Sequence, residues 1–267
     1  MAMFVIAMSL IAMLVTGCGT LKSGQIWGKD ATLCPGLDRI GRSALRAALE
    51  PATLIPAAGA IVFIIDDFDE KVSDWAMDEN PVFGSRTIAG DASDILLGSL
   101  GGSTLITIGA TPGGDKGWEW VRSKAKGLAV EGVALGVAGG AMEALKCSVH
   151  RTRPDREDDQ SFPSGHATIG FSLASITSRN LDSISLPAGL RTGLKGLTYS
   201  AAATLAWARV EAGRHFPSDV LAGAAISHFL TAFVHDAFLG LPEDRDLFCL
   251  EIMPVEKGAF LSFGWSF

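Results

Sequence analysis

Residues 146–166 read KCSVHRTRPDREDDQSFPSGH, and residues 209–219 read RVEAGRHFPSD. The two stretches contain three short motifs, Lys146-x6-Arg153-Pro154, Pro163-Ser164-Gly165-His166 and Arg209-x5-His215-x3-Asp219, which together hold three cationic side chains, two imidazoles and one carboxylate. These are Lys146, Arg153, Arg209, His166, His215 and Asp219. A set of this composition suits the binding of an anionic group together with proton transfer at the same place.

The three cations predict a phosphate site. The oxygens of a phosphoryl group must be neutralised as charge builds on them, and one ammonium and two planar guanidinium groups can do this without a metal. No set of carboxylates or histidines with metal-ligand spacing accompanies them. We therefore expect phosphate-ester chemistry that needs no metal and no other cofactor, with the phosphate bound by Lys146, Arg153 and Arg209.

The two histidines divide the remaining chemistry. One imidazole must attack phosphorus in line while a second protonates the departing alkoxide. Asp219 follows His215 by four residues across the start of an expected helix, so the carboxylate can meet the ring and orient it. We predict His215 as the nucleophile, Asp219 as its orienting partner and His166 as the general acid.

Ser164 and Gly165 precede His166 in a Pro-Ser-Gly turn that would open a helix. Unpaired backbone N–H groups and the positive end of the helix dipole would then point at a bound phosphate. Ser164 and Gly165 are therefore expected to bind the substrate phosphate.

The order and spacing of these residues resemble the three-part signature of the type 2 phosphatidic acid phosphatase (PAP2) superfamily, which also contains bacterial acid phosphatases and vanadium haloperoxidases. The resemblance covers Lys146 to Asp219, under a third of the chain. Members usually carry a serine before the third-motif arginine, where this chain has Ala208. The link from Asp155 to Phe162 is short and acidic, which predicts a tight loop over the site.

The other histidines and acids have simpler interpretations. His228 and His235, seven residues apart on the last long helix, are expected in the core or in an interface. His150 either lines the pocket or lies at a helix end. The acidic run from Asp66 to Glu79 lacks the spacing of a calcium loop and predicts a solvated loop.

The composition indicates a membrane as partner and argues against nucleic acid. The chain has 267 residues, of which 48% are hydrophobic and 19% charged, with a net charge of −7 and a mean hydropathy of +0.31. It shows no basic stripe interleaved with aromatic residues. The sequence leaves the oligomeric state open.

The N-terminus predicts a lipoprotein. Residues 1–16 are apolar and uncharged, and Val15-Thr16-Gly17-Cys18 resembles the lipobox of bacterial lipoproteins, with Cys18 as the lipidated residue. The apolar stretch has the length of a signal peptide. A plain cleaved signal and an N-terminal membrane helix are the alternatives. An oxidising periplasm would also permit a disulfide between Cys34 and Cys249.

Six apolar segments predict an all-α fold, a compact bundle of about six helices. The segments are Pro51–Ile65, Ile95–Thr111, Gly127–Leu145, Ala167–Ser178, Leu197–Ala208 and Val220–Val234. Most are shorter than the ~18–20 uncharged residues that a membrane span requires, and the third contains Glu131 and Glu143. We expect a bundle in the bacterial cell envelope, anchored to the membrane by lipid, with its active site facing the periplasm. An integral membrane protein is the alternative.

The expected organisation is one catalytic domain with extensions: a signal peptide with lipobox (1–18), a linker (19–43), a PAP2-like helical phosphatase domain (44–240) and a small C-terminal β-hairpin (241–267). Ser43 would cap a first helix that is broken near Pro51 and Pro56. Apolar residues alternate with small ones after Phe260, as in a half-buried strand.

Together these expectations define a phosphatase that hydrolyses lipid phosphate monoesters or diphosphates, phosphatidate-like or polyprenyl, through a phosphohistidine intermediate. A non-specific periplasmic acid phosphatase acting on soluble monoesters is the first alternative. A vanadium-dependent haloperoxidase, with vanadate in the same pocket, is the second. A purely structural envelope lipoprotein would leave three intact motifs unexplained.

Overall fold

The computed structural model describes residues 17–21, 24–115, 117–240, 249–255 and 258–264. Of the expected signal peptide with lipobox (1–18), residues 1–16 lie outside this part of the chain. The described chain is mostly helical and contains eight α-helices, two more than expected. They are α2 (Leu37–Leu49), α3 (Pro51–Ile64), α4 (Phe68–Glu79), α5 (Arg86–Ala110), α6 (Trp118–Val149), α7 (Gly165–Ser183), α8 (Ala188–Glu211) and α9 (Pro217–Val234).

Each of the six apolar segments falls within an α-helix to within one residue, but most of these helices are longer than the segments. The expected bounds followed hydropathy, whereas helix ends are set by backbone capping. In α5 the hydroxyl of Ser85 accepts a hydrogen bond from the backbone N–H of Ile88, so this helix begins about ten residues before its apolar part. The two additional helices, α2 and α4, are rich in charged residues and gave no apolar signal.

The break between α2 and α3 occurs where Pro51 predicted it. Pro51 takes the first position of α3, where its missing N–H costs no hydrogen bond, and the two helices meet at an angle of 51°. Pro56 lies within α3 without ending it. The expectation that Ser43 caps the first helix is wrong, because Ser43 is buried in the middle of α2, which begins after Gly36.

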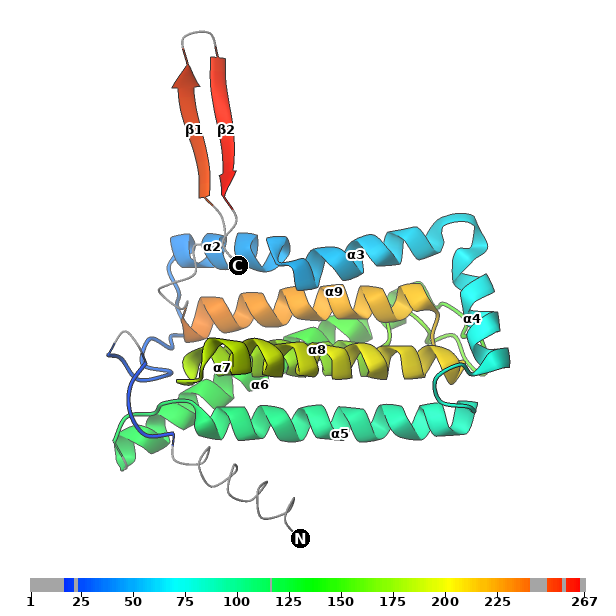
Figure 1. Ribbon diagram of the computed structural model, residues 1–267, viewed down its shortest axis with the longest axis horizontal. Coiled ribbons are helices and arrows are strands. Elements are labelled where there is room, and N and C mark those ends of the chain that lie inside the picture. Colours follow the sequence, from blue (N-terminus) through cyan, green and yellow to red (C-terminus); the bar gives the residue numbers. More distant parts are fainter. Residues whose placement is uncertain (1–16, 22–23, 116, 241–248, 256–257, 265–267) are drawn as a thin grey trace.

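Helix α9 lies at the centre of the bundle (Figure 1) and packs against α3, α7, α6 and α2, while α7 also packs against α8 and α5. Small residues allow these close approaches. A side chain at Gly223 of α9 would meet the carbonyl oxygen of Ser164 at 3.0 Å, and one at Gly170 of α7 would meet Leu205 at 3.2 Å. The short helix α4 crosses one end of the bundle, between α3 and α5 (Figure 1).

Three of the described helices are long and apolar enough to cross a membrane: α5, α6, and α9 continued through the π-helical turn η2 (His235–Leu239) to residue 239. The bent pair of α2 and α3 would make a fourth span. In α5 and in α6, only 28% of the apolar 18-residue stretch that could span a membrane is buried within the protein. Side chains such as Ile95 and Val133 point outward. Glu131, by contrast, is 2% exposed. These helices indicate an integral membrane protein, so the expectation that the segments are too short to span is corrected.

The chain also contains two strands, β1 (Cys249–Val255) and β2 (Gly258–Gly264), which pair antiparallel with Cys249 opposite Gly264. Only their backbone is described, and residues 241–248 lie outside the described part. The expected packing of a C-terminal hairpin on the bundle therefore stays a prediction. The side chain of Cys249 is outside the description too, so the Cys34–Cys249 disulfide also stays a prediction.

Candidate active site

The three sequence motifs meet at one end of the bundle. Because the helices alternate in direction, this end holds the last turns of α6 and α8 and the first turns of α7 and α9. Lys146 and Arg209 lie in the former, and His166 and Asp219 in the latter. His215 immediately precedes α9, and Arg153 lies in the loop between α6 and α7.

His215 is held in one tautomer. Its side chain is almost fully buried, and its Nδ1 atom lies 2.6 Å from the carbonyl oxygen of Ser161. A carbonyl oxygen can only accept a hydrogen bond, so Nδ1 carries the hydrogen and Nε2 keeps its lone pair. Burial, and then the charges of Arg153 and Arg209, hold the pKa of His215 well below its ordinary value. The ring is therefore neutral near pH 7, as a nucleophile must be.

Asp219 does not take the place that the sequence predicted. Its Oδ2 atom accepts from the Ser161 hydroxyl at 2.5 Å and from the Phe216 backbone N–H at 2.9 Å, and its Oδ1 atom accepts from Arg151 at 2.7 Å. The physical reason is its position in the first turn of α9, where the carboxylate caps the helix. Asp219 therefore reaches His215 through Ser161, whose carbonyl oxygen is the recorded partner of Nδ1.

A second buried ion pair anchors this arrangement. Arg151 binds Asp69 of α4 at 2.7 Å, and Asp69 also accepts from the backbone N–H of Ser218 at 2.8 Å. Asp69 is 4% exposed, so the expectation that its acidic run forms a solvated loop is wrong at this residue. Sequence reasoning missed both partners. A weak signal existed for Arg151, which stands two residues before the motif arginine Arg153.

The three predicted cations gather around the histidines. The Nη1 atom of Arg209 donates to the Ser93 hydroxyl at 3.1 Å, while its buried Nε atom has no partner among the described residues. Burial lowers the pKa of Arg209 to about 10, so the group stays charged at pH 7. The charges of Arg153, Arg209 and Lys146 all act on the ring of His215. Such an excess of positive charge with incomplete hydrogen bonding favours an anion.

Ser93 supplies a hydroxyl to Arg209, the residue that follows Ala208. The resembling family usually has a serine before the third-motif arginine, and this chain lacks it. Here a hydroxyl from α5 contacts the same arginine instead. No sequence motif includes Ser93, because it lies more than a hundred residues away from Arg209 in the chain.

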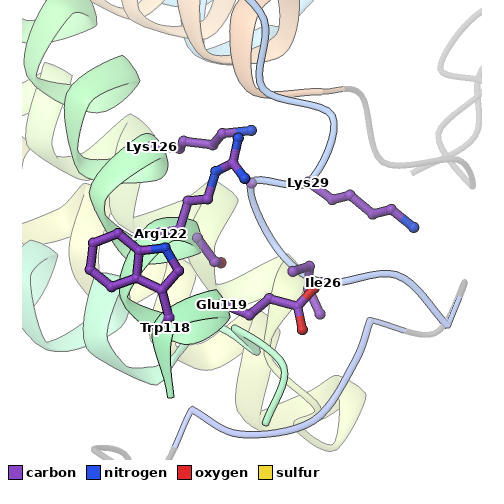
Figure 2. A pocket seen from close by; sticks show the side chains of 8 residues that line it. Ile26, Lys29, Trp118, Glu119, Arg122 and Lys126 are labelled. Carbon is purple, nitrogen blue, oxygen red and sulfur yellow. The ribbon is translucent and has the colours of Figure 1, made fainter. Parts of the chain in front are cut away.

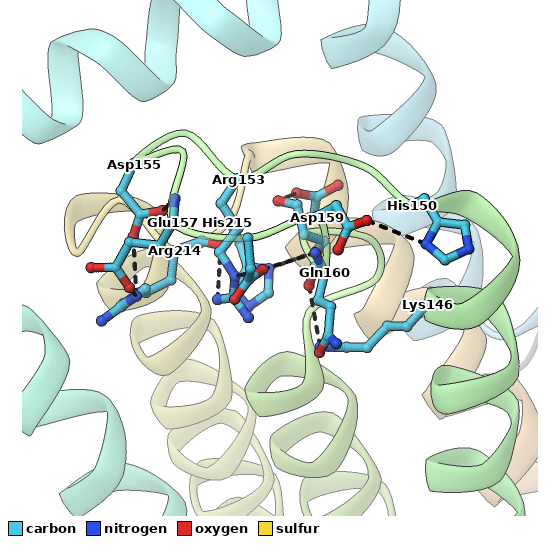
Figure 3. Close-up of polar contacts among 12 residues, drawn as sticks. Lys146, His150, Arg153, Asp155, Glu157, Asp159, Gln160, Arg214 and His215 are labelled. Carbon is cyan, nitrogen blue, oxygen red and sulfur yellow. Dashed lines mark hydrogen bonds and ion pairs between the residues drawn. The ribbon is translucent and has the colours of Figure 1, made fainter.

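The acidic link between the first two motifs covers the site, as predicted (Figure 3). Asp158 accepts from the Nε atom of Arg153 at 2.6 Å, and the carbonyl oxygen of Gln160 accepts from Lys146 at 3.2 Å. Arg214 pairs with Asp155 at 3.2 Å and also with Glu157. The loop is thus tied to the cations by its own carboxylates and backbone.

The remaining histidines lie outside the cluster of motif residues, one at the surface and two in the core. His150 is mostly exposed and pairs with Asp159 at 3.4 Å at one side of the loop (Figure 3), so it lies at a helix end. His228 and His235 are buried in the core, as expected.

The Pro-Ser-Gly turn opens a helix as predicted, with Gly165 as the first residue of α7. The hydroxyl of Ser164 caps the helix by accepting from the Ala167 backbone N–H at 3.4 Å, and the N–H of Ser164 donates to the carbonyl oxygen of Asp219 at 3.1 Å. Phosphate binding at this turn stays a prediction, and the backbone N–H groups of Gly165 and His166 are better placed for it than the Ser164 side chain.

His166 has a partner that the sequence did not reveal. Its Nε2 atom lies 2.8 Å from the Oδ1 atom of Asp94 in α5. Burial, and then the charge of Arg209, lower the pKa of His166, while Asp94 raises it. The general-acid candidate is therefore held between a cation and a carboxylate.

Another basic cleft lies at the opposite end of α6, with a volume of about 370 Å³ (Figure 2). Lys29, Arg122 and Lys126 line it together with Trp118 and Glu119. It contains no histidine and none of the motif residues. Within the described residues, no group of three or more His, Cys, Asp or Glu side chains is arranged to hold a metal ion.

The three motifs lie within a stretch of the chain that matches a known family. Residues 128–241 match the model of the PAP2 superfamily. Over 108 residues the chain is 36% identical to a lipid A 1-phosphatase of Porphyromonas gingivalis, and the match covers 39% of this chain and 23% of that protein. The match thus spans less than a quarter of the length of this curated relative.

A solved structure shares the fold. It is described as the first transmembrane PAP2 type phosphatidylglycerolphosphate phosphatase from Bacillus subtilis, and it has a TM-score of 0.51 at 18% sequence identity. The alignment covers 78% of this chain and 100% of the other. Over residues 128–241 the chain is thus similar to the PAP2 superfamily, and the enzyme class that these matches support is phosphoric ester hydrolase.

Proposed function

We propose that this chain is an integral membrane phosphatase that hydrolyses lipid phosphate monoesters, without a metal, through a phosphohistidine at His215. The observation that carries the proposal is the fixed tautomer of His215 beneath three cations. Its Nε2 lone pair is available at pH 7, and Lys146, Arg153 and Arg209 all act on the same ring.

The chemistry follows from this placement. The Nε2 atom of His215 attacks phosphorus, and the P–O bond to the alcohol breaks with its electron pair moving to oxygen. His166, as imidazolium, gives that oxygen its proton, so a neutral alcohol leaves. Water then attacks the phosphohistidine, its proton passes to His166, and inorganic phosphate departs while His215 is restored. Throughout, the three cations neutralise the charge on the phosphoryl oxygens.

A lipid phosphate is the substrate class that the surroundings of the site support best. The site lies at the ends of helices whose apolar residues face outward, at the depth where lipid headgroups would meet them. Both named relatives act on phosphorylated lipids according to their names. Soluble monoesters are the competing substrates, and a haloperoxidase is disfavoured because no observation points to peroxide chemistry.

The active site is proposed to face the periplasm. Cys18 lies at the other end of the bundle, because Gly17 and Gly19 pair by backbone hydrogen bonds with residues 113 and 114, just after the end of α5. A 25-residue helix is about 37 Å long, more than the ~30 Å apolar core of a bilayer. If α5 spans the membrane, Cys18 and the active site lie on opposite faces, so a Cys18 lipidated on the periplasmic side would place the active site in the cytoplasm. The two expectations exclude each other. We propose the periplasmic active site and keep lipidation of Cys18 as the alternative.

The test is a hydrolysis assay of the purified protein in detergent micelles containing EDTA, against phosphatidate, a lipid A phosphate and nitrophenyl phosphate. We expect phosphate release from the lipids and a stable 32P-labelled phosphoenzyme after an acid-free quench. His215→Ala should abolish both. Loss of activity in EDTA that a divalent ion restores would contradict the metal-independent mechanism, and a preference for soluble monoesters would contradict the substrate class.

A further inference from the structure

Helix α5 contributes two adjacent residues to the site, although it contains none of the three motifs. Ser93 accepts from Arg209 at 3.1 Å, and Asp94 contacts the Nε2 atom of His166 at 2.8 Å. Asp94 is 72 residues away from His166 in the sequence, so the contact depends on the packing of α5 against α7. It brings a further carboxylate, besides Asp158 on Arg153, to the edge of the cationic pocket.

The carboxylate affects how well His166 can hold its proton. The charged groups that face His166 are Asp94 from α5, Arg209 from α8 and Lys146 from α6. The two cations disfavour the imidazolium, and Asp94 is the group that favours it. A hydrogen bond to one ring nitrogen also fixes the orientation of the ring.

The same carboxylate faces the leaving group. Because Nε2 of His166 contacts Asp94, the proton for the leaving oxygen must come from Nδ1, so this oxygen lies within about one imidazole ring of Asp94. An alcohol leaves as a neutral molecule after protonation. The leaving group of a diphosphate is a phosphate anion, which the Asp94 carboxylate repels at this distance.

We propose that Asp94 is a positioning and specificity residue that holds His166 for proton donation and selects phosphate monoesters of neutral alcohols over diphosphates. This inference rests on the proposed phosphatase function and narrows its substrate class. It also excludes a polyprenyl diphosphate as the preferred substrate.

The test compares Asp94→Asn with a matched control, Asp91→Asn. Asp91 lies one turn earlier on α5, is exposed, and has no recorded side-chain contact among the described residues. Both variants remove one negative charge from the same helix. We would measure kcat/KM for phosphatidate and for farnesyl diphosphate in the same micelles, over a range of pH and without metal.

The wild type should prefer phosphatidate. Asp94→Asn should lower kcat/KM for phosphatidate on the order of tenfold and leave that for the diphosphate equal or higher, as expected for removing a nearby like charge. The basic limb of the phosphatidate pH profile should move to lower pH. Asp91→Asn should change none of these. Equal losses on both substrates with an unmoved limb would mean a merely structural role, and a wild type that prefers the diphosphate would overturn the specificity.

A second measurement does not depend on turnover. The titration of His166 can be followed by NMR in protein labelled at histidine, with the signal assigned from His166→Gln. Its pKa should fall in Asp94→Asn and stay unchanged in Asp91→Asn; an unchanged value in both would overturn the positioning role. A wild type that hydrolyses neither lipid would instead contradict the proposed function, whatever this titration shows.

Discussion

The Nδ1 atom of His215 donates to the carbonyl oxygen of Ser161 across 2.6 Å, and the hydroxyl of the same serine donates to Asp219. One residue of the loop between the first two motifs thus connects His215, the proposed nucleophile, to the carboxylate of the third motif. The orientation of the ring depends on the loop backbone, and Asp219 acts by holding that loop in place.

This relationship predicts different consequences for two substitutions. His215→Ala should abolish turnover and the phosphoenzyme, because the atom that attacks is removed. Ser161→Ala keeps the carbonyl oxygen and removes only the hydroxyl that reaches Asp219. We expect a reduction of kcat by about tenfold with a small change in KM, because the ring is less well oriented. Single-turnover measurements of phosphoenzyme formation would check this, and a Ser161→Ala enzyme as inactive as His215→Ala would contradict it.

The ion pairs of Arg151 predict a large effect on stability. Arg151→Met would leave the buried carboxylates of Asp69 and Asp219 without their cation, which costs about 3–5 kcal/mol. The control is Arg42→Met, which removes an exposed pair with Asp38 and should cost at most about 1 kcal/mol. Thermal unfolding in one detergent gives both values. Similar shifts in the two variants would show that the buried network does not hold the site together.

Much of the site could be predicted from the sequence, because motif residues keep their spacing when helices bring them together. His166, His215, Lys146 and Arg209 meet as expected from this spacing. Asp94, Ser93 and Asp69 could not be predicted, since they reach the site only through the packing of α5 and α4, and no local pattern marks them. The structure describes no direct contact between Asp219 and His215, because i and i+4 proximity does not reveal a competing capping contact.

In the fold, too, some features could be predicted from local sequence patterns and others could not. Hydropathy found six helices and a proline break, but it could not locate caps such as Ser85, and so it understated the lengths of α5 and α6. Because a membrane span is judged by its length, the underestimated lengths led to the expectation that these helices do not cross the membrane. Glu131 also counted against a span, although it is buried in the interior of the bundle.

The pKa shifts of the two histidines predict an acidic optimum. His215 has a pKa well below 6.5, so it stays neutral and nucleophilic until the pH falls far below that value. His166 must be protonated, and its pKa is also lowered, so it loses its proton as the pH rises through a value below 6.5. The profile of kcat/KM should be a bell whose basic limb lies below pH 6.5, since this quantity reports the free enzyme.

The assignment of the basic limb can be checked with two substrates. The aryl oxide of an aryl phosphate departs without needing a proton, so this limb should flatten for nitrophenyl phosphate and remain for an alkyl or lipid phosphate. Identical profiles with both substrates, when chemistry limits the rate, would contradict the role of His166 as general acid.

Asp158 predicts competition between the loop and the substrate. Its carboxylate already binds Arg153, so a substrate phosphate must share or displace this contact. Asp158→Asn should lower KM and the inhibition constant of orthovanadate severalfold with little change in kcat. Asp159→Asn is the control, because the neighbouring Asp159 pairs with His150 outside the pocket. A raised KM in Asp158→Asn would show that the carboxylate orients Arg153 for phosphate binding.

Cysteine labelling would determine which end of the bundle faces the periplasm. Cys147 adjoins Lys146 at the active-site end, whereas Cys18 and Cys34 lie at the other end, and all three are exposed. Single-cysteine variants that retain Cys147 or Cys34 can be treated in spheroplasts with a maleimide that does not cross membranes. We expect labelling of Cys147 alone, and labelling of Cys34 only after the membrane is permeabilised. Labelling of Cys34 alone would place the site in the cytoplasm and Cys18 where lipidation occurs. Labelling of both in intact spheroplasts would show that α5 and α6 do not cross the bilayer.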